Sequence, residues 1–239
     1  MRSIEILPGI HVTNDKCLVL DDGPTVVIGD LHLGYERALE DEGMYIPRIN
    51  TTNVIDRLND ILCQYEPSKV ILLGDIKHTF RRSKWEEGKD VKAIIELIRE
   101  ASDVVVVRGN HDNYIQNAIQ GTDVIVTDHM DQSGFRMEHG HIDSGVRPVI
   151  IGHEHPSVRI LDSVGVGMKL PVFVHAREDG VIVLPAFSAF SSGNDLMADR
   201  NCIMADALKK SDYINADLYG ISDLGIISLG KLKDFHEKA

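Results

Sequence analysis

The stretch TVVIGDLH, residues 25–32, joins a short apolar run to an aspartate and a histidine that lie two residues apart. A similar junction occurs twice more, in KVILLGDIKH (69–78) and in DVVVVRGNHD (103–112). The β-branched residues of these runs favour strands that are covered on both faces. Residues 51–65 and 89–101, which separate the runs, carry apolar side chains at helical spacing. Strand and helix therefore alternate, which predicts parallel βαβ units.

After residue 120 the sequence changes to short apolar runs that are separated by turns and show little helical periodicity. A helix is expected near residues 205–210, a last strand at 224–229 and edge strands within 4–20. The other expected strands cover residues 124–126, 135–138, 148–151, 158–161, 172–174 and 181–184. This half predicts a second, more antiparallel sheet. The fold class is therefore expected to be α/β, a four-layer αββα sandwich in which two sheets pack face to face with helices outside.

The composition is that of a globular protein, since 43% of the 239 residues are hydrophobic and 26% are charged. The net charge of −12 excludes a nucleic-acid partner held by a general positive field, so any such contact must be local or assisted by metal cations. No apolar run approaches the roughly 20 residues of a membrane helix, and we expect no membrane association. The three cysteines lack a CxxC pair, which excludes a thiolate zinc finger and favours a cytoplasmic location.

Five apolar runs end in clusters of aspartate, asparagine or histidine. Ligands of α/β sheets bind beyond the carboxyl ends of the strands, so these clusters are expected to meet in one crevice. An aspartate and a histidine two residues apart would point to the same side of an extended segment. Carboxylate, amide and imidazole donors without thiolate suit Mn²⁺, Fe or Zn²⁺, and their number suits two ions. The candidate ligands are Asp30, His32, Asp75, Asn110, His139, His153 and His155.

The motifs DLH, GDIKH, GNHD, HGH and GHEH occur in this order between Asp30 and His155. Together they resemble the calcineurin-like metallophosphoesterase superfamily. The chain is most similar to compact phosphoesterases related to the SbcD-type DNA repair nucleases, including archaeal and helicase-associated bacterial members. The resemblance implies two mixed β-sheets in the αββα sandwich. It also implies a single metallophosphoesterase domain over residues 1–239, without a separate capping domain.

The resemblance also implies a role for each motif residue. One divalent ion would be held by Asp30, His32, Asp75 and His155, and the other by Asp75, Asn110, His139 and His153, so that Asp75 bridges them. His111 corresponds to the family's catalytic histidine, which protonates the leaving oxygen or stabilises the charged phosphorus centre, and Asp112 would orient it. His78 and His141 are expected to support the ligands from outside, and the role of His78 is left open.

The expected function is hydrolysis of phosphodiester bonds in nucleic acid or nucleotides by metal-activated hydroxide, with two divalent ions as cofactors. Mn²⁺ is the expected ion, and Fe, Zn²⁺ or Ni²⁺ are alternatives. Candidate substrate contacts follow the GDIKH motif, where a loop at the cleft rim could grip a nucleic-acid backbone. They are Arg81, Arg82, Lys84 and Trp85, and a solvated loop is the other interpretation of this segment.

Two alternative functions stay open at this point. The chain could be a phosphomonoesterase or a cyclic-nucleotide phosphodiesterase that acts on a small molecule. It could also be a non-catalytic metal-binding subunit of a helicase or DNA repair complex, although an intact His111 argues against this, because a scaffold needs no acid. A helicase or repair protein is a candidate partner, and the sequence does not predict the oligomeric state.

Overall fold

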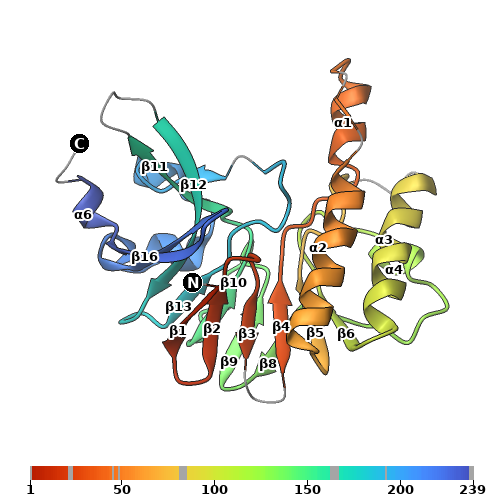
Figure 1. The fold of residues 1–239 in the computed structure, drawn as a ribbon, viewed down its shortest axis with the longest axis horizontal. Coiled ribbons are helices and arrows are strands. Elements are labelled where there is room, and N and C mark those ends of the chain that lie inside the picture. The colour runs from red at the N-terminus through yellow and green to blue at the C-terminus, as the bar shows by residue number, and fades with distance from the viewer. Residues whose placement is uncertain are drawn as a thin grey trace.

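Two β-sheets lie between two layers of helices in the computed structural model (Figure 1). The structure describes residues 2–20, 24–44, 46–47, 49–80, 85–161, 167–191 and 193–236. Both sheets contain parallel and antiparallel strand pairs. The predicted αββα arrangement with two mixed sheets is therefore confirmed.

The first sheet has seven strands within the described residues, and they follow chain order from one edge to the other. The first three strands pair antiparallel, and from the fourth strand onward the pairs are parallel. The strands are β1 (Ser3–Leu7), β2 (Ile10–Thr13), β3 (Leu18–Leu20), β4 (Thr25–Ile28), β5 (Lys69–Leu73), β6 (Asp103–Val107) and β7 (Ile125–Thr127).

The second sheet has nine strands within the same described ranges. Its central strand, β10, pairs in parallel with β9 and β13, while most of the outer pairs are antiparallel. The strands are β8 (His129–Gln132), β9 (Phe135–Glu138), β10 (Val149–Ile151), β11 (Pro156–Leu161), β12 (Gly167–Ala176), β13 (Val181–Val183), β14 (Asn194–Asp195), β15 (Asp217–Ser222) and β16 (Gly225–Lys231).

Helices cover the outer faces of the two sheets. Figure 1 shows α2, α3 and α4 beside β4, β5 and β6, with α6 on the opposite side near β16. The α-helices are α1 (Tyr35–Asp41), α2 (Asn50–Tyr65), α3 (Trp85–Arg99), α4 (Ile115–Ala118), α5 (Asp206–Lys210) and α6 (Lys233–His236). Two short 3-10 helices, η1 (Arg200–Cys202) and η2 (Tyr213–Asn215), lie in the C-terminal third.

Three hydrophobic clusters separate the four layers. Successive residues of β4 divide between two of them: Val26 and Ile28 pack toward α2 and α3, and Val27 packs toward the second sheet. The middle cluster joins both sheets, for example through Ile71 and Ile150. A third cluster fills the space between the second sheet and the C-terminal helices. Burial on both faces explains why the central strands are continuous apolar runs.

The structure corrects one strand assignment. The run expected at residues 124–126 belongs to the first sheet, where β7 pairs in parallel with β6, and not to the second sheet. A change from helical to strand periodicity marks the end of the βαβ region but carries no information about which sheet a single strand joins. Strands β8 and β15 were not expected, because HMDQ and DLYGIS contain few consecutive apolar residues.

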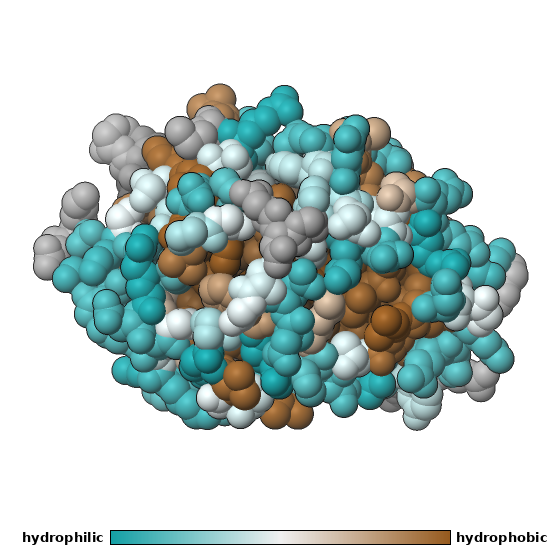
Figure 2. Space-filling model, turned by 90° about the horizontal axis from the view of Figure 1, so that it is seen from below, coloured by the Kyte–Doolittle hydropathy of each residue, from teal (hydrophilic) through white to brown (hydrophobic). Residues whose placement is uncertain are grey.

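Most of the surface that faces the viewer in Figure 2 is hydrophilic, and apolar residues gather there in a few patches. In the part of the chain that the structure describes, no helix combines the length and the apolar character that a membrane crossing requires.

The middle cluster should dominate the stability of the fold. Ile150 on β10 is fully buried between the sheets. We expect Ile150→Ala to lower the free energy of unfolding by about 2–5 kcal/mol, because the change removes buried methyl groups and leaves a cavity. Ile227→Ala, at a position that is 57% exposed on β16, is the matched control. Urea titrations should show a change below about 1 kcal/mol for that control, and equal losses would contradict the placement of the core.

Candidate metal centre

The predicted ligands lie where strands of both sheets end. Asp30, Asp75 and Asn110 follow β4, β5 and β6, whereas His139 and the pair His153 and His155 follow β9 and β10. Backbone hydrogen bonds hold the loops together: the Asp30 amide donates to Gly74 O at 2.9 Å, and the Gly152 amide donates to His139 O at 3.0 Å. The structure thus brings the five motif segments together at one place, as the sequence predicts.

The ligand loops have an unusual backbone. Five of the candidate ligands have positive φ angles between 47° and 64°, namely Asp30, His32, Asp75, His153 and His155. Non-glycine residues seldom adopt this left-handed conformation, and such residues gather at functional sites. The sequence interpretation placed the Asp-x-His and His-x-His pairs on extended segments. That detail is wrong, because these residues lie in loops beyond the strands. Both members of each pair have a left-handed backbone conformation, unlike residues of an extended segment.

Glycines in these loops allow close approach of the acidic ligands. A Cβ atom on Gly109 would lie 2.2 Å from Asp75 Oδ1, and one on Gly152 would lie 2.6 Å from Asp30 Oδ2. A Cβ on Gly74 would lie 2.4 Å from the His139 ring. These motif glycines are therefore required because a side chain would occupy the space of a ligand.

Asp30, His32 and His155 form the first group of potential ligands, with donor atoms within 4.8 Å of one another. His155 Nε2 lies 3.0 Å from Asp30 Oδ1 and 3.2 Å from His32 Nε2. The other ring nitrogen of His155 forms a hydrogen bond of 2.8 Å with Ser191 Oγ. That contact orients the His155 ring with its Nε2 atom toward the centre.

Asp75, His139 and His153 form the second group, also with donor atoms within 4.8 Å. His139 Nε2 lies 3.2 Å from Asp75 Oδ2 and 3.2 Å from Asn110 Oδ1. His139 Nδ1 lies 3.0 Å from Leu73 O, to which it can donate, and this contact directs Nε2 inward.

Asp75 lies between the two groups. Its Oδ2 atom is 3.2 Å from His139 Nε2 in the second group and 4.0 Å from His32 Nε2 in the first. Its Oδ1 atom accepts a hydrogen bond of 2.9 Å from the His111 amide. This position is the one that a bridging carboxylate would need.

The two carboxylates require positive charge around them. Burial disfavours ionised Asp30 and Asp75, yet the imidazoles beside them lower the pKa of both carboxyl groups. In return, and against the effect of burial, Asp75 raises the pKa of His139 to about 9, and Asp30 raises that of His155. In the absence of another cation, the protons on these two rings provide the compensating charge.

The rings of His32 and His153, the other two histidines of these groups, are neutral. Burial lowers the pKa of His32 to about 3 and that of His153 to about 4. Neutral imidazole and ionised carboxylate are the forms that bind metal ions, so the donor set fits two divalent cations. Such ions would replace the protons on His139 and His155 as the positive charge of the centre.

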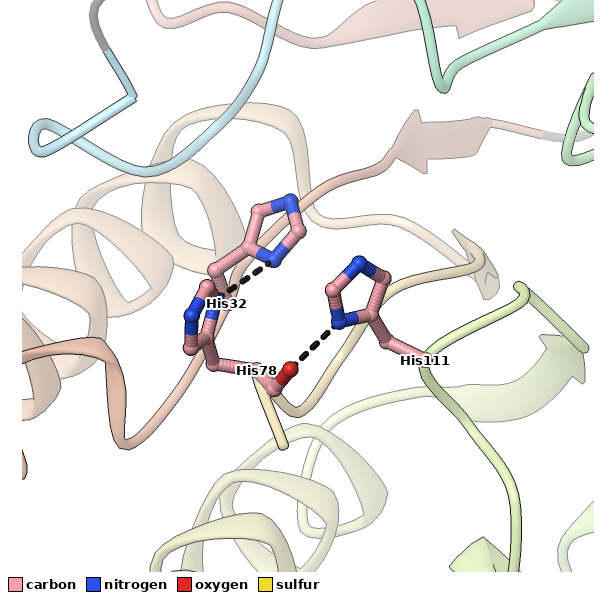
Figure 3. A group of neighbouring side chains, drawn as sticks. All are labelled: His32, His78 and His111. Carbon is pink, nitrogen blue, oxygen red and sulfur yellow. Dashed lines mark hydrogen bonds between the residues drawn. The ribbon is translucent and has the colours of Figure 1, made fainter. Parts of the chain in front are cut away.

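His111 approaches the centre from the loop after β6. Its Nδ1 atom is within hydrogen-bond distance of the carbonyl oxygen of His78 (Figure 3). Its Nε2 atom lies 3.8 Å from Asp75 Oδ2. The Phe80 ring packs on the His111 ring at a centroid distance of 3.7 Å. The carbonyl of His78 and the ring of Phe80 therefore fix the His111 ring with Nε2 toward the ligands.

His78 contacts two of the histidines around it. Its side chain lies beside His32, with 3.4 Å between their Nδ1 atoms, while its carbonyl contacts His111 (Figure 3). The supporting role of His78 stays a prediction, since its ring also lies with those of His32 and His111 in a third group of potential metal ligands. His141 differs, because its exposed ring lies 5.4 Å from the His139 ring and makes no hydrogen bond within the described part of the chain.

The carboxylate of Asp112 does not contact the His111 ring. It accepts hydrogen bonds of 2.9 Å from the amides of Ile76 and Gly109, and thereby joins the loops after β5 and β6. Burial raises the pKa of Asp112 to about 6. The sequence interpretation gave Asp112 the task of orienting His111. Its contacts instead position the backbone of the loop that contains His111, because a buried carboxylate accepts hydrogen bonds from the amides that face it.

The structure does not describe some of the predicted site residues, and it contains one contact at the site that the sequence did not predict. Arg81, Arg82 and Lys84 fall outside the described residues, as does the side chain of Trp85. Ser191, which contacts His155, was not expected, because nothing in the sequence around it differs from an ordinary loop serine.

Comparison with known proteins identifies the family of this chain. The family model for calcineurin-like phosphoesterases matches residues 23–157, a span that contains every candidate ligand. The chain belongs to the calcineurin-like phosphoesterase family. Members of this family are hydrolases that act on phosphoesters and use divalent metal ions. No curated protein matches the sequence.

Two solved structures resemble this phosphoesterase. The crystal structure of the nuclease MPE from Pseudomonas putida aligns with a TM-score of 0.68 and 22% identity, over 92% of this chain and 96% of that one. This likeness shows a common fold. The protein of unknown function AQ665 from Aquifex aeolicus aligns with a TM-score of 0.36 and 18% identity, over 54% of this chain and 77% of that one. The narrower resemblance to SbcD-type nucleases stays a prediction.

A substitution at Gly109 tests the centre without replacing any of the candidate ligands. In Gly109→Ala the new Cβ would overlap the Asp75 carboxylate, so we expect the variant to bind fewer than two Mn²⁺ ions per chain. The control is Gly88→Ala on α3, where the nearest atom to the new Cβ is 4.0 Å away. That control should keep the metal content of the parent and gain up to about 1 kcal/mol in stability. Elemental analysis after dialysis measures the ions, and full metal content in Gly109→Ala would contradict the assignment.

Proposed function

We propose that this phosphoesterase is a phosphodiesterase with a two-metal centre that cleaves nucleic acid or nucleotides. The observation that carries the proposal is the meeting of two histidine and carboxylate groups around Asp75, with His111 beside them. Asp30, His32, Asp75 and His155 would hold one ion, and Asp75, Asn110, His139 and His153 the other. Mn²⁺ is the ion that we propose, because the donors are oxygen and imidazole nitrogen without thiolate.

Two divalent ions held by these residues would polarise the phosphoryl group and would lower the pKa of water, which would supply hydroxide near neutral pH. The side chains of this chain would supply the rest of the chemistry. His111 contacts the His78 carbonyl through Nδ1, which leaves Nε2 as the atom that faces the reacting phosphate. From there it can give a proton to the leaving oxygen or stabilise negative charge at phosphorus.

Two observations support a phosphodiester of nucleic acid or nucleotides as the substrate. The structural relative with the higher TM-score is described as a nuclease. The centre is also flanked by pockets of about 530 Å³ and about 320 Å³, one beside His139 and the other beside His155. Space on both sides of the reacting phosphate is what a phosphodiester with two substituents requires. A helicase or repair partner stays a prediction.

Loss of the His111 side chain should separate binding of metal from catalysis. We expect His111→Ala to keep both metal ions and to lose roughly 10²–10³-fold in kcat on bis(p-nitrophenyl) phosphate with Mn²⁺, because it lacks the side chain that stabilises negative charge at phosphorus. His11→Ala on β2, outside the five motif segments, should behave like the parent. Hydrolysis by His111→Ala at the parental rate would remove His111 from the mechanism.

The segment after the GDIKH motif tests the choice of substrate. If it contacts nucleic acid, replacing Arg81, Arg82 and Lys84 by alanine should raise KM for a single-stranded oligonucleotide roughly tenfold or more, since three phosphate contacts are removed. Hydrolysis of bis(p-nitrophenyl) phosphate, which has no neighbouring phosphate, should stay unchanged. Equal loss on both substrates would show that the three cations do not bind a polymer.

A further inference from the structure

A pocket of about 320 Å³ lies directly beside the candidate ligand His155. Segments that are distant in the sequence form it: the turn between β2 and β3, the ends of β11 and β12, and the loop before β14. Lys16, Lys169, His155 and Ser191 are among the residues that line it. Its volume is at the lower end of the roughly 300–1,000 Å³ that is typical of ligand pockets.

The charge of this pocket is opposite to that of the protein. Two lysines, Lys16 and Lys169, line it, and none of its described lining residues is an aspartate or a glutamate. The chain as a whole has a net charge of −12. A positively charged pocket on such a surface attracts an anion to this place in preference to the rest of the molecule.

Both ammonium groups are held at the pocket and retain unused donors. Lys16 Nζ donates to Ser188 O at 3.3 Å, and Lys169 Nζ donates to Gly193 O. Since a lysine ammonium has three N–H groups, each can still donate to a bound oxygen. Burial and the charge of Arg57 lower the pKa of Lys16 to about 8, so this group is still largely protonated at neutral pH.

The pocket on the other side of the centre has a different character. Its Arg108 is paired with Asp128 at 3.2 Å, and Glu138 also lines it. Of these two pockets, the one beside His155 therefore offers more unpaired positive charge among the residues that the structure describes. This asymmetry distinguishes the two directions in which a substrate could extend from the metal centre.

We propose that Lys16 and Lys169 bind a second phosphate of the substrate, one that is covalently linked to the phosphate at the metal centre. The inference rests on the proposed function and narrows the substrate class to compounds with consecutive phosphates. The next phosphodiester of a polynucleotide and a further phosphate of a nucleoside triphosphate share this chemistry.

Binding without metal tests the pocket independently of catalysis. We expect Lys16→Gln and Lys169→Gln each to weaken binding of a fluorescein-labelled single-stranded oligonucleotide roughly three- to tenfold, as measured by anisotropy without divalent ions. Each change should also reduce the slope of log Kd against log salt concentration by about 0.7, the value for one phosphate contact on a single strand. Lys92→Gln, an exposed lysine of α3 that pairs with Glu96, is the control of equal charge change. Equal effects of all three variants would overturn the proposal.

Kinetics then separate this inference from the function itself. With Mn²⁺, the pocket variants should raise KM for an oligonucleotide or for a nucleoside triphosphate, and hydrolysis of bis(p-nitrophenyl) phosphate should be unchanged. The substrate whose KM rises identifies the source of the second phosphate. A parent enzyme that is inactive on every substrate would reject the proposed function. An active parent with variants that bind and cleave like it would reject only the pocket. Because Lys169 is exposed, its variant should fold even if Lys16→Gln does not.

Discussion

The structure depends on the burial of two neighbouring carboxylates, Asp30 and Asp75, which are 0% and 2% exposed. Two such charges repel each other and lose the solvation that water provides, so they are stable only beside compensating positive charge. Imidazole rings surround them, and the contacts with Leu73 and Ser191 orient two of these rings toward the centre. A site that already requires cationic charge is suited to divalent metal ions.

The fold meets this requirement by ending strands of two sheets at one place. Parallel strands β4, β5 and β6 deliver their loops to a common edge, and the ends of β9 and β10 reach the same edge from the second sheet. The apolar strands anchor these loops, because burial on both faces leaves little freedom to shift register. The rigid strands and the strained turns that follow them therefore hold the potential ligand atoms within short distances of one another.

Much of this could be predicted from the sequence, because strand ends and their polar residues lie together in the chain. The βαβ region and the two-sheet sandwich follow from local patterns, whereas the grouping of Asp30, His32 and His155 follows from the resemblance to the family. The sheet that β7 joins and the hydrogen bond from the Ile76 amide to Asp112 depend on long-range packing, which no local pattern encodes. Ser191 and the lysine pocket could not be predicted for the same reason, since both arise from contacts between segments that are distant in the sequence.

Glu154, which separates two candidate ligands, links the centre to the C-terminal third of the chain. Its buried carboxylate accepts hydrogen bonds from the amides of Met204 and Ala205 at 2.8 and 2.7 Å, and the Ser188 amide donates to Asp30 O at 3.1 Å. All three of these amides belong to residues beyond 157, where the family match ends. The signature motifs alone are thus insufficient for an intact centre. A fragment that ends at residue 157 would keep every motif but would lose the backbone amides that hold Glu154 and the Asp30 carbonyl in place.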